Sequence, residues 1–275
     1  MRKIIAGLLL LLMAGPVLAQ VVEGDDAPLR FGRFEAEGAI HFGFLSFGGL
    51  NQLDKDFLDP ESKPTGWVYD LRGVKLLAPL NRGKIIALSN NYRSQKTSPE
   101  FELIVSDRLA GPEDSLAVDQ GRFAGEMVVV IAKTAQNITS KDAAGYIYGV
   151  ACGLLEYSRS QLRQVAVGPY VVPGLSYDGL HLQVAVNGKV LRKIQTRKLK
   201  QKVGQLVAWL SRHVRLEAGD MIFTGAPGKL LSLNKGDVVE VSLEGVGSLK
   251  TSLAGKACSE PHGKTGLKLC SQIFP

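Results

Sequence analysis

A single carboxylate, Glu126, stands at the head of the apolar stretch MVVVIA, residues 127–132. Hard divalent cations such as Mg²⁺ and Ca²⁺ are held by several oxygen ligands, most often carboxylates. Two further acids at the nearby alanines Ala124 and Ala151 would complete a metal site, but the sequence has methyl groups there. A glutamate at the start of a strand can also lie at the solvent edge, and the residues alone leave both roles open.

Cysteine supplies the second candidate chemistry. Cys258 and Cys270 bracket the C-terminal stretch CSEPHGKTGLKLC. In an oxidising compartment such a pair predicts a disulfide, which by chain entropy would add about 3 kcal/mol of stability. The alternative is two free thiols that bind a metal beside His262, but this set lacks a fourth ligand. Cys152 lies in an apolar segment and is predicted to be a buried small hydrophobe.

The N-terminus predicts export into such a compartment. Arg2 and Lys3 precede the apolar stretch IIAGLLLLLMAG, and VLA before Gln20 is typical of a cleavage site, so we expect residues 1–19 to be a signal peptide. A membrane anchor is the alternative, but a span needs about 20 apolar residues. No later stretch is long enough to cross a membrane. The expected location is periplasmic or secreted.

The charge of the chain is only mildly basic. Its formal charge is +7, and removal of Arg2 and Lys3 with the signal would leave +5. Basic residues cluster in KVLRKIQTRKLKQK, residues 189–202. A solvated edge explains this stretch best, ahead of attraction to an anionic membrane surface. No recognition motif accompanies it, so we expect no nucleic-acid partner.

The elements that must position these residues are mostly strands. Residues 28–48 alternate apolar and polar with glycine punctuation, which predicts short antiparallel strands. Residues 49–68 are predicted to be an extended loop because of their polarity and two X-Pro pairs. A domain boundary is expected near residue 80. Residues 125–133, GEMVVVIAK, predict a buried strand.

Two helices and a hairpin follow in the second part. Residues 139–162 show helical spacing after Thr139 and Ser140, and residues 199–213 form an amphipathic pattern with a basic end. The Asn187-Gly188 pair between alternating runs is a strong hairpin signal. Many strands with only two helices predict a β-rich α+β fold.

Several motifs together resemble the fumarylacetoacetate hydrolase family, whose members act on β-diketo and 2-oxo acids. The resemblance spans residues 30–252, and its most specific part is GDMIFTGAPGKLLSLNKGDVVEV, residues 219–241. It implies a mixed β-sandwich roll in residues 81–254, a small N-terminal β domain in residues 20–80, and a homodimer. Residues 255–275 would be a tail. The other matching motifs are NNY, LAGPED, GEMVVVIAK, DAAGYIYGVA, VGPYVV, VNGKV and GVGSL.

The resemblance implies a metal site that this chain does not match. Active relatives hold Mg²⁺ or Ca²⁺ with Glu-x-Glu on a strand and an Asp on the following helix. Carried onto this sequence, the second Glu is Glu126, the first is Ala124 and the Asp falls on Ala151. We therefore predict no cofactor.

The acid–base residues implied by the resemblance are also altered. In the family's Asn-Tyr-x-x-His-x-x-Glu loop, Tyr92 is kept but the His becomes Gln95 and the Glu becomes Ser98, and a lysine before LAGP falls near Ile104. Gln cannot exchange protons near neutral pH. Of the substrate-binding turn, Thr224 and Gly225 remain.

Three functions stay open on this basis. The first is an impaired or inactive family member that binds a small oxo-acid or a protein partner. The second is an active metal-dependent hydrolase, hydratase or decarboxylase, with Tyr92 and Gln95 as candidate catalytic residues and Tyr92, Thr224 and Gly225 as candidate substrate contacts. The third is an envelope interaction protein that uses residues 189–202 and the tail. Each retained residue can also be structural: Tyr92 as a core aromatic, Thr224 and Gly225 for turn geometry.

Overall fold

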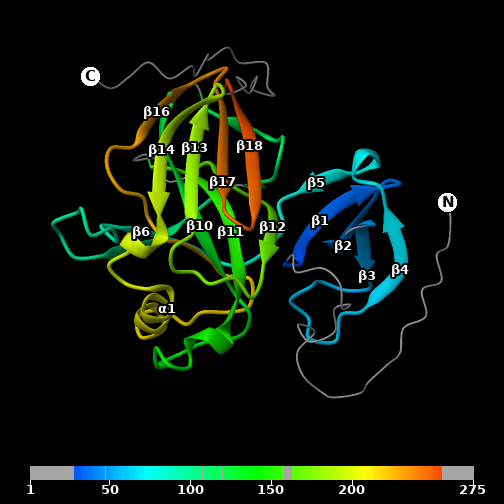
Figure 1. Cartoon of the computed structure of the whole chain (residues 1–275), viewed down its shortest axis with the longest axis horizontal. Coiled ribbons are helices and arrows are strands. Elements are labelled where there is room, and N and C mark those ends of the chain that lie inside the picture. The colour runs from blue at the N-terminus through cyan, green and yellow to red at the C-terminus, as the bar shows by residue number, and fades with distance from the viewer. Residues whose placement is uncertain (1–27, 47, 107, 119, 158–162, 256–275) are drawn as a thin grey trace, which may run out of the picture.

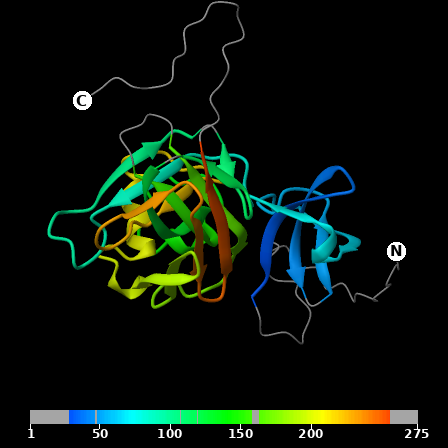
Figure 2. The same cartoon turned by 90° about the horizontal axis from the view of Figure 1, so that it is seen from above.

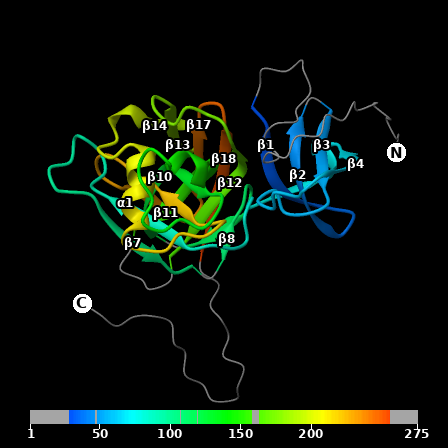
Figure 3. The ribbon, with the colours of Figure 1, turned by 90° about the horizontal axis from the view of Figure 1, so that it is seen from below.

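The computed structural model describes residues 28–46, 48–106, 108–118, 120–157 and 163–255. The predicted signal peptide and the predicted Cys258–Cys270 disulfide lie outside these residues. The described chain forms a small N-terminal lobe beside a larger body (Figure 1). Views from above and below keep the lobe at one side of the body (Figures 2 and 3). The β-rich α+β fold expected from the sequence is confirmed.

The lobe is an antiparallel meander in the order β4-β3-β2-β1, with β5 paired to the second half of β1 on its other edge. The alternation predicted for residues 28–48 is confirmed, since β1 and β2 pair from Arg30↔Leu45 to Ala36↔Ala39. A single register pair, Phe31↔Val171, continues the lobe sheet into β12 of the body. The bounds are β1 Arg30–Ala36, β2 Ala39–Ser46, β3 Gly49–Leu53, β4 Pro64–Tyr69 and β5 Lys75–Leu77.

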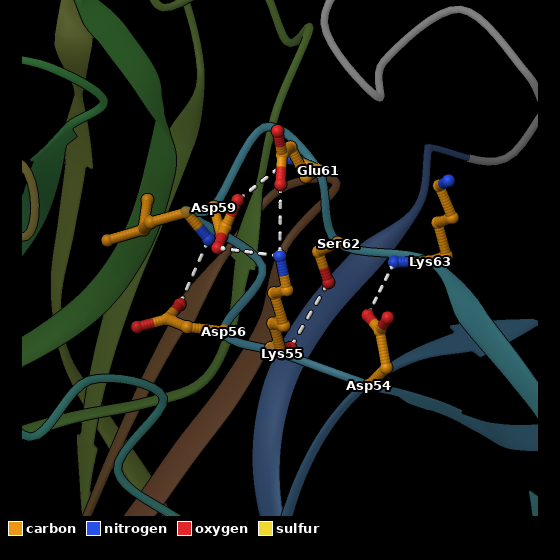
Figure 4. Close-up of polar contacts among 8 residues, drawn as sticks. Asp54, Lys55, Asp56, Asp59, Glu61, Ser62 and Lys63 are labelled. Atoms are coloured by element: carbon orange, nitrogen blue, oxygen red, sulfur yellow. Dashed lines mark hydrogen bonds and ion pairs between the residues drawn. The ribbon is translucent and has the colours of Figure 1, made fainter.

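The loop predicted for residues 49–68 was wrong at both ends, where β3 and β4 form. Residues 64–68 of β4 are all exposed on this edge strand, and its Pro64 and Gly66 favour a loop when only the sequence is considered. The segment between the two strands is the true loop, and its own side chains organise it (Figure 4). Asp54 accepts from the Lys63 N–H at 2.7 Å, and Asp59 accepts from the Glu61 N–H at 2.8 Å.

The large sheet continues through the body in the order β12-β11-β10-β15-β6-β7. The central strand β10 is buried over its last nine residues, Phe123–Ile131, so the predicted buried strand is confirmed. The bounds are β6 Ile85–Ser89, β7 Glu100–Ile104, β8 Leu109–Ala110, β10 Gln120–Ile131, β11 Ile147–Glu156, β12 Val165–Val172, β15 Met221–Phe223 and β16 Leu231–Asn234.

A second sheet, β14-β13-β17-β18-β9, packs closely against β10. A Cβ added to Gly125 would meet Val184 at 2.6 Å and Val241 at 2.9 Å, so only glycine allows this approach. The predicted hairpin is confirmed, with Asn187 and Gly188 at φ 50° and 79° between β13 and β14. The bounds are β9 Ser115–Ala117, β13 His181–Val186, β14 Lys189–Gln195, β17 Val238–Leu243 and β18 Gly247–Ala254.

Of the two helices expected, one is present as an α-helix, α1 (Val203–Ser211). Figure 1 shows it at the lower end of the body. Its Leu206 and Leu210 are fully buried in the core, as the amphipathic pattern predicts. In the described residues, no helix has the length and apolar character needed to cross a membrane.

The helix predicted over residues 139–162 was wrong. The chain forms a short 3-10 turn, η3 (Ala143–Tyr146), and then strand β11. Nine of the ten residues of β11 are buried, so both strand faces are apolar and the spacing cannot distinguish strand from helix. Cys152 is buried as expected, but on this strand, and burial raises the pKa of its thiol to about 12.

Candidate functional site

The site is built on one face of the β10–β11 ladder. Glu126 pairs with Gly153, Ala124 with Leu155, and Val128 with Ala151. Residues two apart on a strand, and residues paired directly across it, point to the same face. Glu126 therefore shares its face with all of these positions.

Ala151 was expected on a helix and lies instead on β11, opposite Val128. The residue that forms a corner with Ala124 and Glu126 is Leu155, directly opposite Ala124. Ala151 shares this face and lies diagonally across the ladder from Glu126, as Leu155 does on the other side of Gly153. Neither side chain carries an oxygen, and Gly153 between them has no side chain.

Glu126 is buried, with 1 % of its surface exposed, so the solvent-edge alternative was wrong. The Tyr157 hydroxyl donates to Oε1 at 2.6 Å, and the Gly225 N–H donates to Oε2 at 2.6 Å. Burial raises the pKa of Glu126 to about 8, although both hydrogen bonds act to lower it. At neutral pH this carboxyl group is therefore mostly protonated.

Two tyrosines surround the carboxyl group. Burial, followed by the nearby Glu126 charge, raises the pKa of both Tyr92 and Tyr157 well above its usual value. Both phenols therefore stay neutral, and that of Tyr157 donates a hydrogen bond to Glu126. Sequence reasoning missed Tyr157. Its place directly after β11, one residue past Glu156, becomes meaningful only once the β10–β11 register is known.

The retained turn is held by hydrogen bonds within the protein. Thr224 donates its hydroxyl to the Met127 carbonyl at 3.0 Å, and the buried Asn91 amide donates to the Thr224 carbonyl at 3.2 Å. Gly225 has φ 85°, and a Cβ there would lie 3.0 Å from the Leu88 carbonyl. These bonds give both predicted substrate contacts a structural role in shaping the turn.

Gln95 links the two loops of the site. Its side-chain oxygen accepts from the Tyr92 N–H at 2.8 Å, and its Nε2 donates to the Ala226 carbonyl at 3.5 Å. The structure thus brings together Tyr92, Gln95, Glu126 and the Thr224-Gly225 turn. It leaves Ser98 exposed and Ile104 buried at the end of the edge strand β7.

The residues present do not fit a hard cation. Among the residues that the structure describes, no group of three or more His, Cys, Asp or Glu side chains could hold a metal ion. Glu156, the next acid along β11, is on the opposite face from Glu126, and its Oε2 accepts from the Gln164 N–H at 3.0 Å. At positions 124–128 and 151–155, Glu126 is the only acid on its face of the ladder. Its carboxyl group is protonated near neutral pH and is held by two hydrogen bonds.

The protein combines mixed sheets, a small β lobe and a site at a Thr-Gly turn beside a buried strand. These features define a class of β-rich α+β proteins. Residues 87–254 match the family pattern described as fumarylacetoacetate (FAA) hydrolase C-terminal, and residues 29–79 match one described as Rv2993c-like, N-terminal. The chain belongs to the fumarylacetoacetate hydrolase family. The resemblance inferred from the motifs is thereby confirmed.

Relatives by sequence include enzymes and an uncharacterized protein. A protein of Archaeoglobus fulgidus is 32 % identical over 246 residues, covering 80 % of this chain and 94 % of its own. The 4-hydroxyphenylacetate degradation bifunctional isomerase/decarboxylase of Escherichia coli is 31 % identical over 201 residues, which is 62 % of this chain and 47 % of that protein.

Solved structures agree with the fold. The 5-carboxymethyl-2-hydroxymuconate delta-isomerase of Mycobacterium smegmatis has a TM-score of 0.77 at 26 % identity, covering 82 % of this chain and all of that one. Maleylpyruvate hydrolase from Sphingobium, in complex with manganese(II) and pyruvate, has a TM-score of 0.71 at 20 % identity, with 83 % and 100 % covered. The latter similarity concerns the fold alone.

Proposed function

We propose that the protein is an exported member of the family that binds a small oxo-acid without metal-dependent turnover. One observation carries the proposal. On the face where a cation would need several oxygen ligands, Glu126 has Ala124, Ala151, Gly153 and Leu155 as its neighbours, none of which carries a side-chain oxygen.

The physical argument concerns the balance of metal binding. Mg²⁺ gives up its water reluctantly and needs several anionic oxygens to offset that cost. Deprotonating Glu126 would add a further cost, because a ligand must lose its proton before it coordinates a metal. Its two oxygens would also have to leave Tyr157 and Gly225. Without a cation, the site lacks the Lewis acid that stabilises a developing enolate.

Calorimetric titration of the purified chain with Mg²⁺, Mn²⁺ and Ca²⁺ tests this proposal. We expect no binding tighter than about millimolar, the weak end for oxygen-ligand sites. The matched gain-of-function variant is Ala124→Glu with Ala151→Asp, which places acids at both of the other ligand positions that the family resemblance implies. This variant should bind Mn²⁺ more tightly than the natural chain. Micromolar binding by the natural chain would refute the proposal.

An active enzyme is the second candidate, supported by the activities named for the relatives and by the retained Thr224-Gly225 turn. Turnover of acylpyruvates or oxaloacetate by the natural chain would support it. Activity that survives both Tyr92→Phe and Gln95→Ala would exclude these residues from catalysis. Absence of turnover across the panel, with and without added Mn²⁺, would leave the binding function.

Export, the tail disulfide and the homodimer belong to the same proposal. Expressed with its full N-terminus, the protein should be recovered with Gln20 as its first residue. Thiol counting before and after reduction should show Cys258 and Cys270 paired. Light scattering on the purified protein should give twice the chain mass, and a monomer would contradict the dimer.

A further inference from the structure

Basic side chains line a free edge of the body, the β14 edge. Strand β14 ends the second sheet, and among the described strands it pairs with β13 alone. Figure 1 shows it on the side of the body away from the lobe. From β14 the chain runs through the turn η4 (Thr196–Lys198) to the start of α1. Residues 189–202 contain no acid and seven basic residues: Lys189, Arg192, Lys193, Arg197, Lys198, Lys200 and Lys202.

Few acids neutralise these charges. Within the part of the chain that the structure describes, Lys202 is the one of the seven that forms an ion pair, with Asp178 at 2.9 Å. Asp237 lies beside the turn between β13 and β14, where it accepts from the Asn187 amide at 2.8 Å. Four of the basic side chains are exposed and form no ion pair within the described residues: Lys189, Lys193, Arg197 and Lys198. The β14 edge therefore carries a net positive charge.

Two apolar side chains are exposed among these charges. Val190 and Leu191 of β14 have 45 % and 38 % of their surface exposed. Neighbouring residues of a regular strand point to opposite faces, so one of the two is normally buried when one face of the sheet is covered. The register with β13 shifts at this point, and Leu191 is the extra residue of a bulge. The bulge leaves both apolar side chains in contact with solvent, between Lys189 and Lys193.

Charge on an edge strand has a simpler use, which is to stop the sheet from pairing with another chain. Exposed Val190 and Leu191 act against that use, because apolar residues on an edge favour association. Residues 189–202 also contain no Phe, Tyr or Trp on which nucleic-acid bases could stack. Unpaired cations beside exposed apolar side chains fit an anionic lipid surface, whose phosphates attract the cations and whose headgroup layer accepts the apolar groups.

We propose that the β14 edge attaches the protein to the surface of a bilayer that contains anionic phospholipids. Lys189 and Lys193 contact the lipid phosphates, and Val190 and Leu191 between them enter the headgroup layer. Lysine suits this position because its apolar stem can lie along the layer while its ammonium group stays in water. The proposal goes beyond the binding of an oxo-acid, and it holds with or without turnover.

The test uses the chain from Gln20 onward, because the apolar residues before it would bind lipid by themselves. Binding is measured by sedimentation with vesicles of phosphatidylcholine alone and of phosphatidylcholine mixed with phosphatidylglycerol. We expect binding to the mixed vesicles only. It should be lost between about 0.1 M and about 1 M salt, over which the Debye length falls from about 10 Å to about 3 Å.

Two double variants test the two parts of the edge. Lys189→Gln with Lys193→Gln should weaken binding to the mixed vesicles by about tenfold or more, since each charge near an anionic surface contributes about fivefold. Val190→Ser with Leu191→Ser leaves the charge unchanged and should still weaken binding several-fold. The matched control is Lys63→Gln with Lys75→Gln, which removes two exposed lysines of the lobe and should bind as the natural chain does. All substituted positions are exposed, so the urea midpoints should stay close to that of the natural chain.

The inference is overturned if the natural chain does not bind the mixed vesicles, if it binds phosphatidylcholine alone equally well, or if the control loses as much as the lysine pair of β14. Loss with the lysine pair but not with the apolar pair would support attachment by charge and overturn the entry of Val190 and Leu191 into the headgroup layer. Binding of polyglutamate without binding of vesicles would also overturn the inference and would identify an acidic protein segment as the partner.

Discussion

The carboxyl group of Glu126 holds its proton over a different pH range in the folded and the unfolded chain. Its ordinary pKa of 4.5 is raised to about 8 on folding, mainly because of burial. Between these values the folded chain keeps a proton that the unfolded chain has lost. This contribution to stability is therefore present in full below about pH 4.5 and is lost as the pH rises to about 8.

Replacing Glu126 by Gln should flatten this dependence. The amide stays neutral, so the free energy of unfolding of Glu126→Gln should fall less than that of the natural chain between pH 5 and pH 9. Across this window the falls in unfolding free energy of the two chains should differ by roughly 4 kcal/mol, at about 1.4 kcal/mol per pKa unit. Urea unfolding at several pH values measures it. The exposed Glu35→Gln serves as the control, and equal pH profiles for Glu126→Gln and the natural chain would contradict the buried proton.

Asn91 ties three segments together at the site. Its amide donates to the Thr224 carbonyl at 3.2 Å and its side-chain oxygen accepts from the Gln201 N–H at 3.0 Å, with no exposed surface. Asn91→Ala should destabilise the chain by about 2–3 kcal/mol, because both backbone groups lose a buried partner. The control is Asn51→Ala, whose amide bonds Ser46 near the surface and should cost under about 1 kcal/mol. A small effect at Asn91 would show that water replaces its bonds.

At this scale the sequence located most of the site but left open whether Glu126 is buried. The motifs that resemble the family identified Tyr92, Gln95, Glu126, Thr224 and Gly225, and the structure brings these residues together. The burial of Glu126 and its bond to Tyr157 depend on strand register and on tertiary packing, which single-residue patterns do not encode.

Among the elements, β11 shows why sequence spacing failed. Its residues are apolar on both faces, and two glycines replace side chains where neighbours come close. A Cβ on Gly153 would meet Val128 at 2.4 Å and Phe223 at 2.5 Å. A helix pattern and a doubly buried strand look alike in such a segment, whereas the Asn187-Gly188 hairpin is specified by its turn.

Gly153→Ala tests this packing directly. The added methyl group should destabilise the chain by about 1–3 kcal/mol, since Val128 and Phe223 must move. Gly145→Ala is the matched control, because a Cβ there meets nothing within 4 Å. It should be neutral or slightly stabilising. Thermal unfolding of both variants provides the measurement, and equal effects at the two sites would contradict the close approach at Gly153.

In the whole molecule, the lobe and the body are joined through the loop between β3 and β4. Phe57 of this loop is buried and contacts Tyr148 of β11, with ring centroids 5.2 Å apart. Asp56 beside it forms an ion pair with Arg82 at 2.8 Å. The resemblance seen in the sequence predicted a small β lobe but not these contacts, because they join residues far apart in the chain, up to about 90 positions for Phe57 and Tyr148. The loop composition gave no sign that Phe57 faces the body.

Phe57→Ala should weaken the coupling between the lobe and the body. The loss of a buried Phe costs about 3–5 kcal/mol, and here part of that cost falls on the contact with the body. The chain has two tryptophans, Trp67 in the lobe and Trp209 in the body, so each reports on one part. Each tryptophan substitution has its own effect on stability, so in the natural background the urea midpoints of Trp209→Phe and Trp67→Phe set the reference for the two signals.

With Phe57→Ala added to both backgrounds, the lobe signal from Trp67 should move to lower urea than the body signal from Trp209. Phe57→Leu keeps most of the apolar volume and should leave the two midpoints close together. Equal shifts of the two midpoints in Phe57→Ala would place the coupling in other contacts between lobe and body, among them the Phe31↔Val171 pairing, the Phe31–Tyr148 ring contact and the Asp56–Arg82 ion pair. In that case Asp56→Asn in the Phe57→Ala background would separate the signals only if the ion pair carries the coupling. Since exposed ion pairs contribute about 0–1 kcal/mol, we expect the aromatic contact to dominate.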